Sequence, residues 1–371
     1  MKLRAVLQPQ RRRRLLLPLL LLLMSLATLA CGRGAGPATR EDGGSPAAAE
    51  AASADADVEG TSPSPSGAQG PGAFDRRLSP AASPDSRSPG AAAAQGGAGS
   101  FSLSSGSIVY ESHGADRVNI HRYDAGAARP VALTDRRARD LRPRWSPDGA
   151  QVAFFSDASG NDEIWVVNAD GTGLRRLTDH PGADFDPDWL PDGRLLFASD
   201  RDGDENIYVL DPGDGAITQL THYDSGRTGG PSAAADGRRI TFSSDGIFSW
   251  QVYVLDVGSG AIERITGPAP GACNPAWRPG SDRIAYMSGG DLIGTDLRSV
   301  APSGADSRRL AGDTGNNEDP QFAEDGSRMV WVSDRDGNWE IWEADGDGNG
   351  ERRVSRTPQD ERHPDLYIGS G

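Results

Sequence analysis

The chain has 371 residues and a formal net charge of −15 at pH 7, from 53 acidic and 38 basic side chains. A chain this acidic has no positively charged surface for nucleic acid, and an anionic lipid surface would repel it. Its two cysteines also exclude a framework of several disulfides.

Residues 1–30 have the layout of an export signal. Residues 1–14 carry six basic and no acidic side chains, and Leu15–Ala30 is an apolar run shorter than the roughly 20 residues of a membrane-spanning helix. The run ends in Leu-Ala-Thr-Leu-Ala-Cys-Gly, which resembles the signal of bacterial lipoproteins, in which the cysteine is lipidated. We therefore predict a lipid on Cys31, and the alternative is an ordinary cleaved signal peptide.

Removal of this signal and lipidation of Cys31 would each change the mature protein. The six bases are lost, so the net charge of the mature protein falls from −15 to −21. A lipid on Cys31 would leave Cys273 without a disulfide partner, and we expect Cys273 to be half-buried.

Residues 31–106 are predicted to be a disordered tether. From Gly32 to Ser100 the only large apolar residues are Val58, Phe74 and Leu78, and most of the rest are Ala, Gly, Ser and Pro. Such a segment cannot bury enough apolar surface to offset the entropy lost on ordering. We expect it to connect the lipid to a folded domain that begins at residue 107.

Residues 107–371 contain a repeated unit, seen in full from Pro143 to Thr178 as four short apolar runs separated by turn residues. The proline that heads the first run recurs every 44 or 45 residues, at Pro143, Pro187, Pro231, Pro275, Pro320 and Pro364. Four strands in such a period are typical of a β-propeller blade.

The phase of the repeat predicts how the ring closes. Residues 107–134 supply only the second, third and fourth strands of a unit, whereas His363–Tyr367 supply a first strand and nothing after it. Joining the two segments gives six blades and leaves no open sheet edge between the first and last blades. The predicted fold class is therefore all-β, a monomeric six-bladed β-propeller closed by its C-terminal strand. In the fifth unit Gly289-Gly290 replaces the usual Ser-Asp loop, and we expect this blade to be the most mobile.

The unit resembles the repeat of TolB-type propellers, which are WD-repeat-like and common in bacterial envelope proteins. The resemblance is plainest in SDRDGDENIY (199–208) and SDRDGNWEIW (333–342). It implies the six-bladed fold and an extracytoplasmic location. In TolB itself a mixed α/β domain precedes the propeller, where this chain has the predicted tether, so docking to the Tol partners does not follow.

The residue before each repeated proline is expected at one mouth of the central channel, which is a common place for binding sites. We predict that Arg142, Asp186, Asn274, Asp319 and His363 form a mouth that binds a partner's peptide, a sugar or a cation. The alternative is that these are polar loop residues bonded to free backbone groups at the starts of strands.

A second ring follows the serine that ends each second strand. It consists of Asp157, Asp200, Asp245 and Asp334, with His113 and Gly289 in the other two blades. Serine and aspartate at such positions satisfy turn amides, so we expect this ring to be structural.

No catalytic residues, metal ligands or cofactor are predicted, because there is no Gly-x-Ser-x-Gly motif and no further catalytic domain. Asp345–Gly350 resembles the opening of a calcium loop, but Arg356 stands where the bidentate glutamate belongs. The resemblance also reaches propeller lyases of oligogalacturonides, which hold a metal with several histidines. Here His180, His222 and His363 precede first strands at unequal distances from their prolines.

The primary prediction is a non-enzymatic, lipid-anchored propeller facing the periplasm or cell surface. Its expected partner is an envelope protein or a cell-wall component, bound at the channel mouth, with a cation in the channel left open. The alternatives are a metal-dependent carbohydrate-active enzyme and a small-ligand sensor that use the histidines and aspartates of the mouth.

Overall fold

The computed structural model describes residues 99–369 except 246–248, 268–269, 290–293 and 313. The predicted signal peptide, Cys31 and nearly all of the tether lie outside these residues. The described residues form β-strands, turns and loops. Within this part of the chain no helix has the length and hydropathy needed to cross a membrane.

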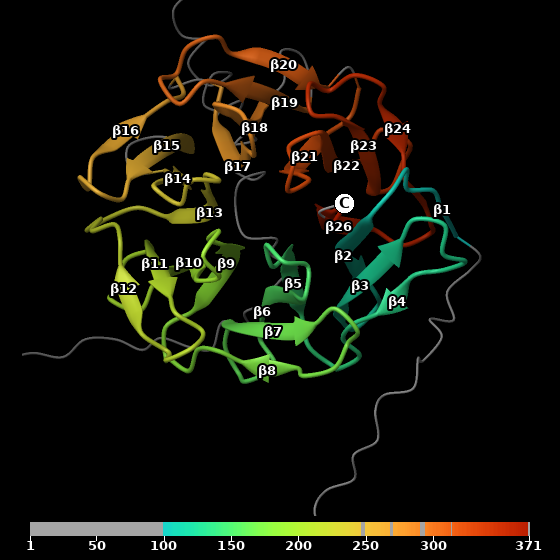
Figure 1. Ribbon diagram of the computed structural model, residues 1–371, viewed down its shortest axis with the longest axis horizontal. Helices are drawn as coiled ribbons and strands as arrows, with labels where there is room; N and C mark the ends of the chain where they lie inside the picture. The colour runs from blue at the N-terminus through green and yellow to red at the C-terminus, as the bar shows by residue number, and fades with distance from the viewer. Residues whose placement is uncertain (1–98, 246–248, 268–269, 290–293, 313, 370–371) are drawn as a thin grey trace, which may run out of the picture. The chain divides into compact units, whose positions relative to one another are not determined.

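Six four-stranded antiparallel sheets stand around a central axis like the blades of a propeller (Figure 1). Blade 1 consists of β26 (Glu361–Tyr367), β2 (Ser107–His113), β3 (Val118–Asp124) and β4 (Val131–Ala132). Blade 2 consists of β5 (Asp140–Trp145), β6 (Gln151–Ser156), β7 (Glu163–Asn168) and β8 (Arg175–Arg176). Blade 3 consists of β9 (Asp184–Trp189), β10 (Leu195–Ser199), β11 (Asn206–Leu210) and β12 (Ile217–Gln219).

The other three blades follow the same order. Blade 4 consists of β13 (Thr228–Ala233), β14 (Arg239–Ser244), β15 (Gln251–Asp256) and β16 (Ile262–Arg264). Blade 5 consists of β17 (Ala272–Arg278), β18 (Arg283–Gly289), β19 (Thr295–Val300) and β20 (Arg308–Ala311). Blade 6 consists of β21 (Asn317–Phe322), β22 (Arg328–Ser333), β23 (Glu340–Asp345) and β24 (Arg352–Arg353). In every blade the first strand named is innermost and the fourth lies at the periphery (Figure 1).

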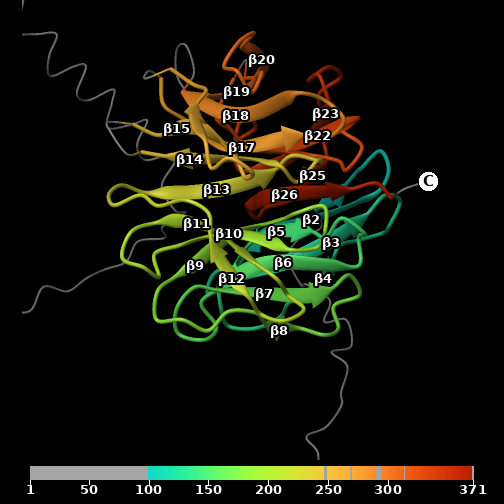
Figure 2. The same ribbon diagram turned by 60° about the vertical axis from the view of Figure 1, so that its left-hand side comes forward.

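The ring closes as the repeat predicts. The C-terminal strand β26 pairs with β2 from Ser107↔Tyr367 to Ser112↔Glu361, so blade 1 joins the two ends of the propeller. This confirms the predicted fold class, an all-β six-bladed propeller closed by its C-terminal strand. Neighbouring blades pack against one another, as β9 does beside β13 (Figure 2).

The folded part begins earlier than residue 107. A short strand β1 (Ser100–Phe101) pairs with β25 (Ser355–Arg356) at the edge of blade 6. The ring of Phe101 lies 5.4 Å from that of Tyr110 and 4.9 Å from that of Tyr123, and Leu103 is buried. These two apolar side chains supply the buried surface that holds the segment in place.

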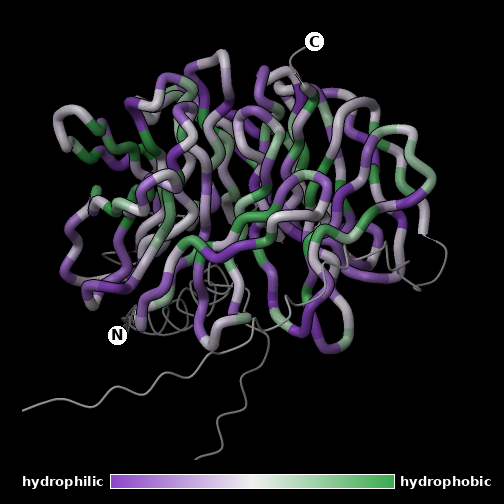
Figure 3. Tube along the Cα trace, turned by 60° about the horizontal axis from the view of Figure 1, so that its bottom comes forward, coloured by the Kyte–Doolittle hydropathy of each residue, from purple (hydrophilic) through white to green (hydrophobic). Residues whose placement is uncertain are grey.

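The core lies between blades and is built mainly from the second and third strands. In the second strands of blades 2 and 3, β6 and β10, every residue except Gln151 is buried. Hydrophobic residues gather along the strands, and the loops at both rims are mostly hydrophilic (Figure 3). The propeller therefore exposes its polar loops and buries its β-rich apolar runs, as expected for packed sheets.

Cys273 differs from the expectation. It is fully buried on β17, with 1% of its surface exposed, and it is disulfide-bonded rather than half-buried and free. The reason for its burial is its place on the innermost strand of blade 5, against the side chains of blade 6.

Candidate functional site

The same backbone feature shapes the channel mouth in all six blades. The pairing of the first and second strands shifts at the repeated proline, so two residues of the first strand oppose one of the second. This is a β-bulge, which bends a strand and re-aims a side chain. The residue before each proline has a positive φ, at Arg142 (51°), Asp186 (53°), Gly230 (58°), Asn274 (50°), Asp319 (55°) and His363 (45°).

A positive φ is uncommon for residues other than glycine and marks backbone strain. Among the described residues, the bulge positions account for all such residues except Asp306, which lies in a turn. The strain is offset by hydrogen bonds from the bulge amides to neighbouring blades. Arg142 N donates to Glu111 Oε1 (2.6 Å), Gly230 N to Asp186 Oδ2 (3.0 Å) and Asn274 N to Ser243 Oγ (3.1 Å).

The structure brings all five predicted mouth residues together in one charged network. Arg142 Nε lies 2.9 Å from Asp186 Oδ1, and its Nη1 lies 3.9 Å from Asp319 Oδ1. Asn274 Nδ2 donates to Asp319 Oδ1 (2.5 Å), and His363 Nε2 lies 3.1 Å from Asp319 Oδ2. The network thus links blades 1, 2, 3, 5 and 6 across the axis.

Glu111 on β2 completes the network and was not predicted. Its carboxylate is fully buried, 2.6 Å from His363 Nδ1 and 2.9 Å from His113 Nε2. The N–H direction at His363 Nδ1 does not meet the carboxylate, so that contact is electrostatic rather than a well-formed hydrogen bond. The sequence does distinguish Glu111, because the residue at the equivalent position of every other blade is uncharged. These residues are Phe155, Ala198, Ser243, Met287 and Val332.

The surroundings of Glu111 and Asp319 keep both carboxylates ionised. Burial by itself would raise the pKa of Glu111, but the charge of His363 and the hydrogen bond with His113 hold that pKa well below its usual range. Burial would likewise raise the pKa of Asp319, and the charges of His363 and Arg142 outweigh it and lower that pKa.

Glu318 titrates differently from its neighbour Asp319. Burial and the charge of Asp319 raise the pKa of Glu318 to about 7, although Arg362 lies 3.1 Å away and opposes the shift. Deeper in the channel, burial raises the pKa of Asp365 to about 7 against the charge of Arg144. The channel therefore holds carboxyl groups that exchange protons near neutral pH.

The mouth is narrow because its own side chains fill it. The cavity between Arg142, Asp186, Asn274 and Asp319 has a volume of about 10 Å³, which leaves room for about one water molecule. The side chains of Arg142, Asp186 and His363 are 13%, 15% and 14% exposed. A partner can therefore reach the edge of this network, whereas passage through it would require the side chains to separate.

The second ring makes one repeated contact. Each aspartate accepts a hydrogen bond from a backbone N–H in the segment that leads into the first strand of its own blade. The pairs are Arg139 N to Asp157 (2.8 Å), Ala183 N to Asp200 (2.7 Å), Arg227 N to Asp245 (2.6 Å) and Asn316 N to Asp334 (2.7 Å). These aspartates connect the two loops of blades 2, 3, 4 and 6 at the face of the mouth.

The remaining candidates have local partners. His180 accepts a hydrogen bond from Gly182 N, and His222 lies in an exposed part of its loop. Asp345 accepts hydrogen bonds from the amides of Asp347 and Asn349 within a hairpin turn. Across the described ranges, no group of three or more His, Cys, Asp or Glu residues is placed to hold a metal ion.

Comparison with known proteins agrees with this architecture. A family model described as the TolB beta propeller domain matches residues 98–229 and 230–367. The uncharacterized peptidase YuxL of Bacillus subtilis is 32% identical over 125 residues, 33% of this chain and 18% of that protein. A TolB homologue of Chlorobium chlorochromatii is 30% identical over 142 residues, 38% of this chain and 32% of that protein. The chain thus spans only a minor part of either relative.

Among solved structures, the crystal structure of TolB from Acinetobacter baumannii superposes with a TM-score of 0.62 at 22% identity, over 71% of this chain and 67% of that one. This likeness shows the fold. Because the family model covers nearly all of the propeller, the chain belongs to the TolB beta propeller domain family.

Proposed function

We propose that this protein is an exported, non-enzymatic binding module of the bacterial cell envelope, and that the channel mouth docks a protein partner. The observation that carries the proposal is the contrast between the two rings at this face. The second ring repeats one side chain, aspartate, at four of its six positions. The mouth repeats only the backbone, and its positions hold Arg, Asp, Gly, Asn, Asp and His.

A purely architectural position would repeat its side chain along with its backbone. Diverse, mutually bonded polar groups held on a strained but repeated backbone are typical of a recognition surface. The carboxylates of Asp186, Asp319, Glu111 and Glu318 lie beside Arg142, Arg362 and His363 there, so the network carries both signs of charge. Such an edge favours a partner segment that presents polar or charged groups rather than an apolar one.

The proposal is tested by crosslinked capture from intact cell envelopes, comparing the native protein with an Asp186→Asn/His363→Asn double variant. Asparagine keeps the size of aspartate and removes the charges that face Arg142 and Asp319. The matched control is Asp157→Asn/Asp245→Asn, which makes the same kind of change in the second ring. Thermal unfolding of each variant shows that it is folded.

The expected result is one protein partner captured by the native chain and by the control, and reduced at least tenfold with the double variant. Equal capture by a folded double variant would overturn the proposed location. Capture of cell-wall glycan instead of protein would overturn the proposed class of partner.

The lipid anchor stays a prediction from the sequence. A cysteine sulfur carries either a lipid thioether or a disulfide, and the chain has two cysteines, one of which is the disulfide-bonded Cys273. A lipid on Cys31 and a disulfide between the two cysteines of one molecule therefore exclude each other. The intact mass of protein extracted from envelopes distinguishes the two states.

A further inference from the structure

One layer of the blades is nearly uniform around the ring. The third buried residue of each second strand faces the third strand, and in five blades the two partners are both aromatic rings. We call these five pairs, together with their counterpart in blade 5, the aromatic tier. The five pairs are Tyr110–His121, Phe154–Trp165, Phe197–Tyr208, Phe242–Tyr253 and Trp331–Trp342.

In blades 2, 3 and 6 an arginine side chain lies over the aromatic pair of the tier. The rings of Phe197 and Tyr208 lie 5.6 Å apart, and Arg201 lies about 5 Å above both. Arg136 lies 4.1 Å from the Trp165 ring, and Arg335 lies 4.2 Å from the Trp342 ring. Such cation–π contacts cover the aromatic surface.

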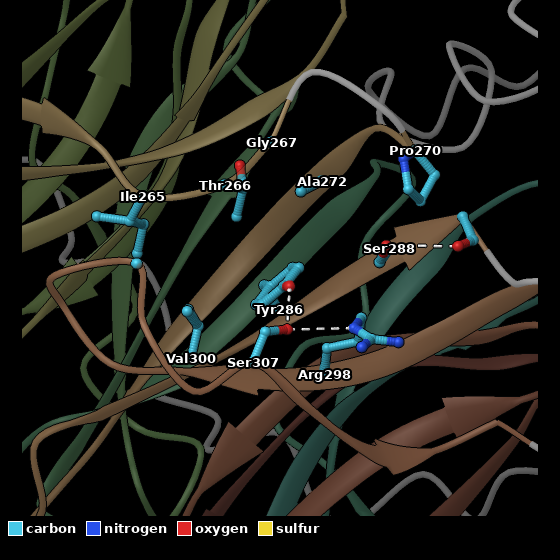
Figure 4. A pocket seen from close by; sticks show the side chains of 12 residues that line it. Ile265, Thr266, Gly267, Pro270, Ala272, Tyr286, Ser288, Arg298, Val300 and Ser307 are labelled. Carbon is cyan, nitrogen blue, oxygen red and sulfur yellow. Dashed lines mark hydrogen bonds between the residues drawn. The ribbon is translucent and has the colours of Figure 1, made fainter.

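Blade 5 departs from this pattern at a single cross-strand partner. Tyr286 on β18 keeps the aromatic position, but it pairs with Arg298 on β19 instead of a ring. Where the tier of the other blades is filled, blade 5 has a pocket of about 270 Å³, just below the usual size range of small-molecule sites. Figure 4 shows Tyr286 and Arg298 together in this pocket.

The lining of the pocket has two chemically different parts. Ile265, Pro270, Ala272 and Val300 supply apolar surface. Arg298 Nε donates to Ser307 Oγ (3.3 Å), which also lies 3.1 Å from the Tyr286 hydroxyl (Figure 4). Among the described residues of the lining Arg298 is the only charged one, and it forms no ion pair with any carboxylate that the structure describes.

A cationic pocket in a chain of net charge −15 requires a specific explanation, because most arginines described here face an aspartate or glutamate. A guanidinium with a free edge and adjacent hydroxyl groups binds carboxylates with charge-assisted hydrogen bonds. The missing ring of the tier and the apolar wall favour a flat ring beside that carboxylate.

We propose that this pocket binds a small ring-bearing carboxylate. Its carboxylate lies on Arg298 with the hydroxyl groups of Ser307 and Tyr286, and its ring lies against the apolar wall where the other blades place an aromatic side chain. The pocket is independent of the channel mouth, so this site stands apart from the proposed docking function.

Isothermal titration calorimetry of the full mature chain tests the proposal with benzoate, 4-hydroxybenzoate and indole-3-acetate. Acetate is the control that lacks a ring, and benzyl alcohol is the control that lacks a carboxylate. At least one ring-bearing carboxylate is expected to bind at least tenfold more tightly than either control.

Two variants and a matched control assign the site. Arg298→Met keeps the aliphatic stem and removes the charge, and it is expected to weaken binding at least tenfold. Arg298→Trp restores the filled tier and is expected to abolish binding. Arg264→Met, on the exposed strand β16, is expected to leave binding unchanged. Absence of binding of all three probes to the native chain, or equal binding by native and folded Arg298→Met proteins, would overturn the proposal.

Discussion

The channel mouth and the aromatic tier use the same repeat in opposite ways. At the mouth, six blades share one unusual backbone conformation and vary its side chain. In the tier, the blades share one kind of cross-strand contact, and only Tyr286–Arg298 departs from it. In each region, the feature that repeats from blade to blade is the one that the fold requires. Where a blade departs from the repeat, a requirement other than folding determines the residue.

The two regions also differ in what stabilises them. The mouth is held by charge pairs and hydrogen bonds between blades, and the loss of one partner leaves another charge buried. The tier is held by apolar burial and ring contacts, and the loss of a ring leaves unfilled space. Single substitutions in the two regions separate the unfolding free energy lost with a charge partner from the unfolding free energy lost with a packed ring.

The largest effect is expected for Arg142→Met, which removes a guanidinium that contacts both Asp186 and Asp319. Removal of one partner from a buried charge network costs about 3–5 kcal/mol of unfolding free energy. Urea unfolding at pH 7 measures it. Arg194→Met is the control, because Arg194 pairs with Asp192 at the exposed surface and such pairs contribute at most about 1 kcal/mol. Similar losses for the two variants would show that the mouth network is not a stabilising unit.

An intermediate effect is expected for Trp342→Arg, which gives blade 6 the pattern of blade 5. It removes a ring paired with Trp331 and places a second guanidinium beside Arg335. We expect a loss of about 2–3 kcal/mol, since buried aromatic contact is lost and like charges approach. Differential scanning calorimetry measures it.

The reverse change, Arg298→Trp in blade 5, sharpens the comparison. It fills the pocket of about 270 Å³ and is expected to change stability by no more than about 1 kcal/mol, because the added ring occupies existing space. A large loss for Arg298→Trp would mean that Arg298 is itself part of the packing of blade 5.

The sequence predicts the fold because the period, the prolines and the turn residues are local signals that recur. The mouth residues are predictable for the same reason, since each stands beside a repeated proline. Glu111, Arg144 and Asp365 are harder to predict, because they act through neighbours in other blades that are far away in the chain. The pocket is harder still, since Arg298 is informative only once the register opposite Tyr286 is known. The segment from Ser100 to Leu103 is missed because serine and glycine around it resemble the tether.

The last predicted effect is a pH dependence at the deeper level of the channel. Burial raises the pKa of Asp365 to about 7 in the folded protein, from an ordinary value of 3.8. The folded protein then binds more protons than the unfolded chain between those values, so the stability that Asp365 contributes is lost as pH rises through about 7. Asp365→Asn removes this titration while keeping an oxygen that can accept the hydrogen bond from Trp145 N.

The native protein should therefore lose more stability between pH 5 and pH 8 than Asp365→Asn does, by about 2 kcal/mol. Urea unfolding at both pH values measures the difference. Asp148→Asn is the control, because hydrogen bonds from Ser146 and Ala150 lower the pKa of Asp148 and it stays ionised throughout this range. An equal decline in native and Asp365→Asn proteins would mean that the channel carboxyl is charged at pH 5, and that Arg144 rather than burial controls its protonation. That outcome would extend the charge pairing seen at the mouth to the deeper level of the channel.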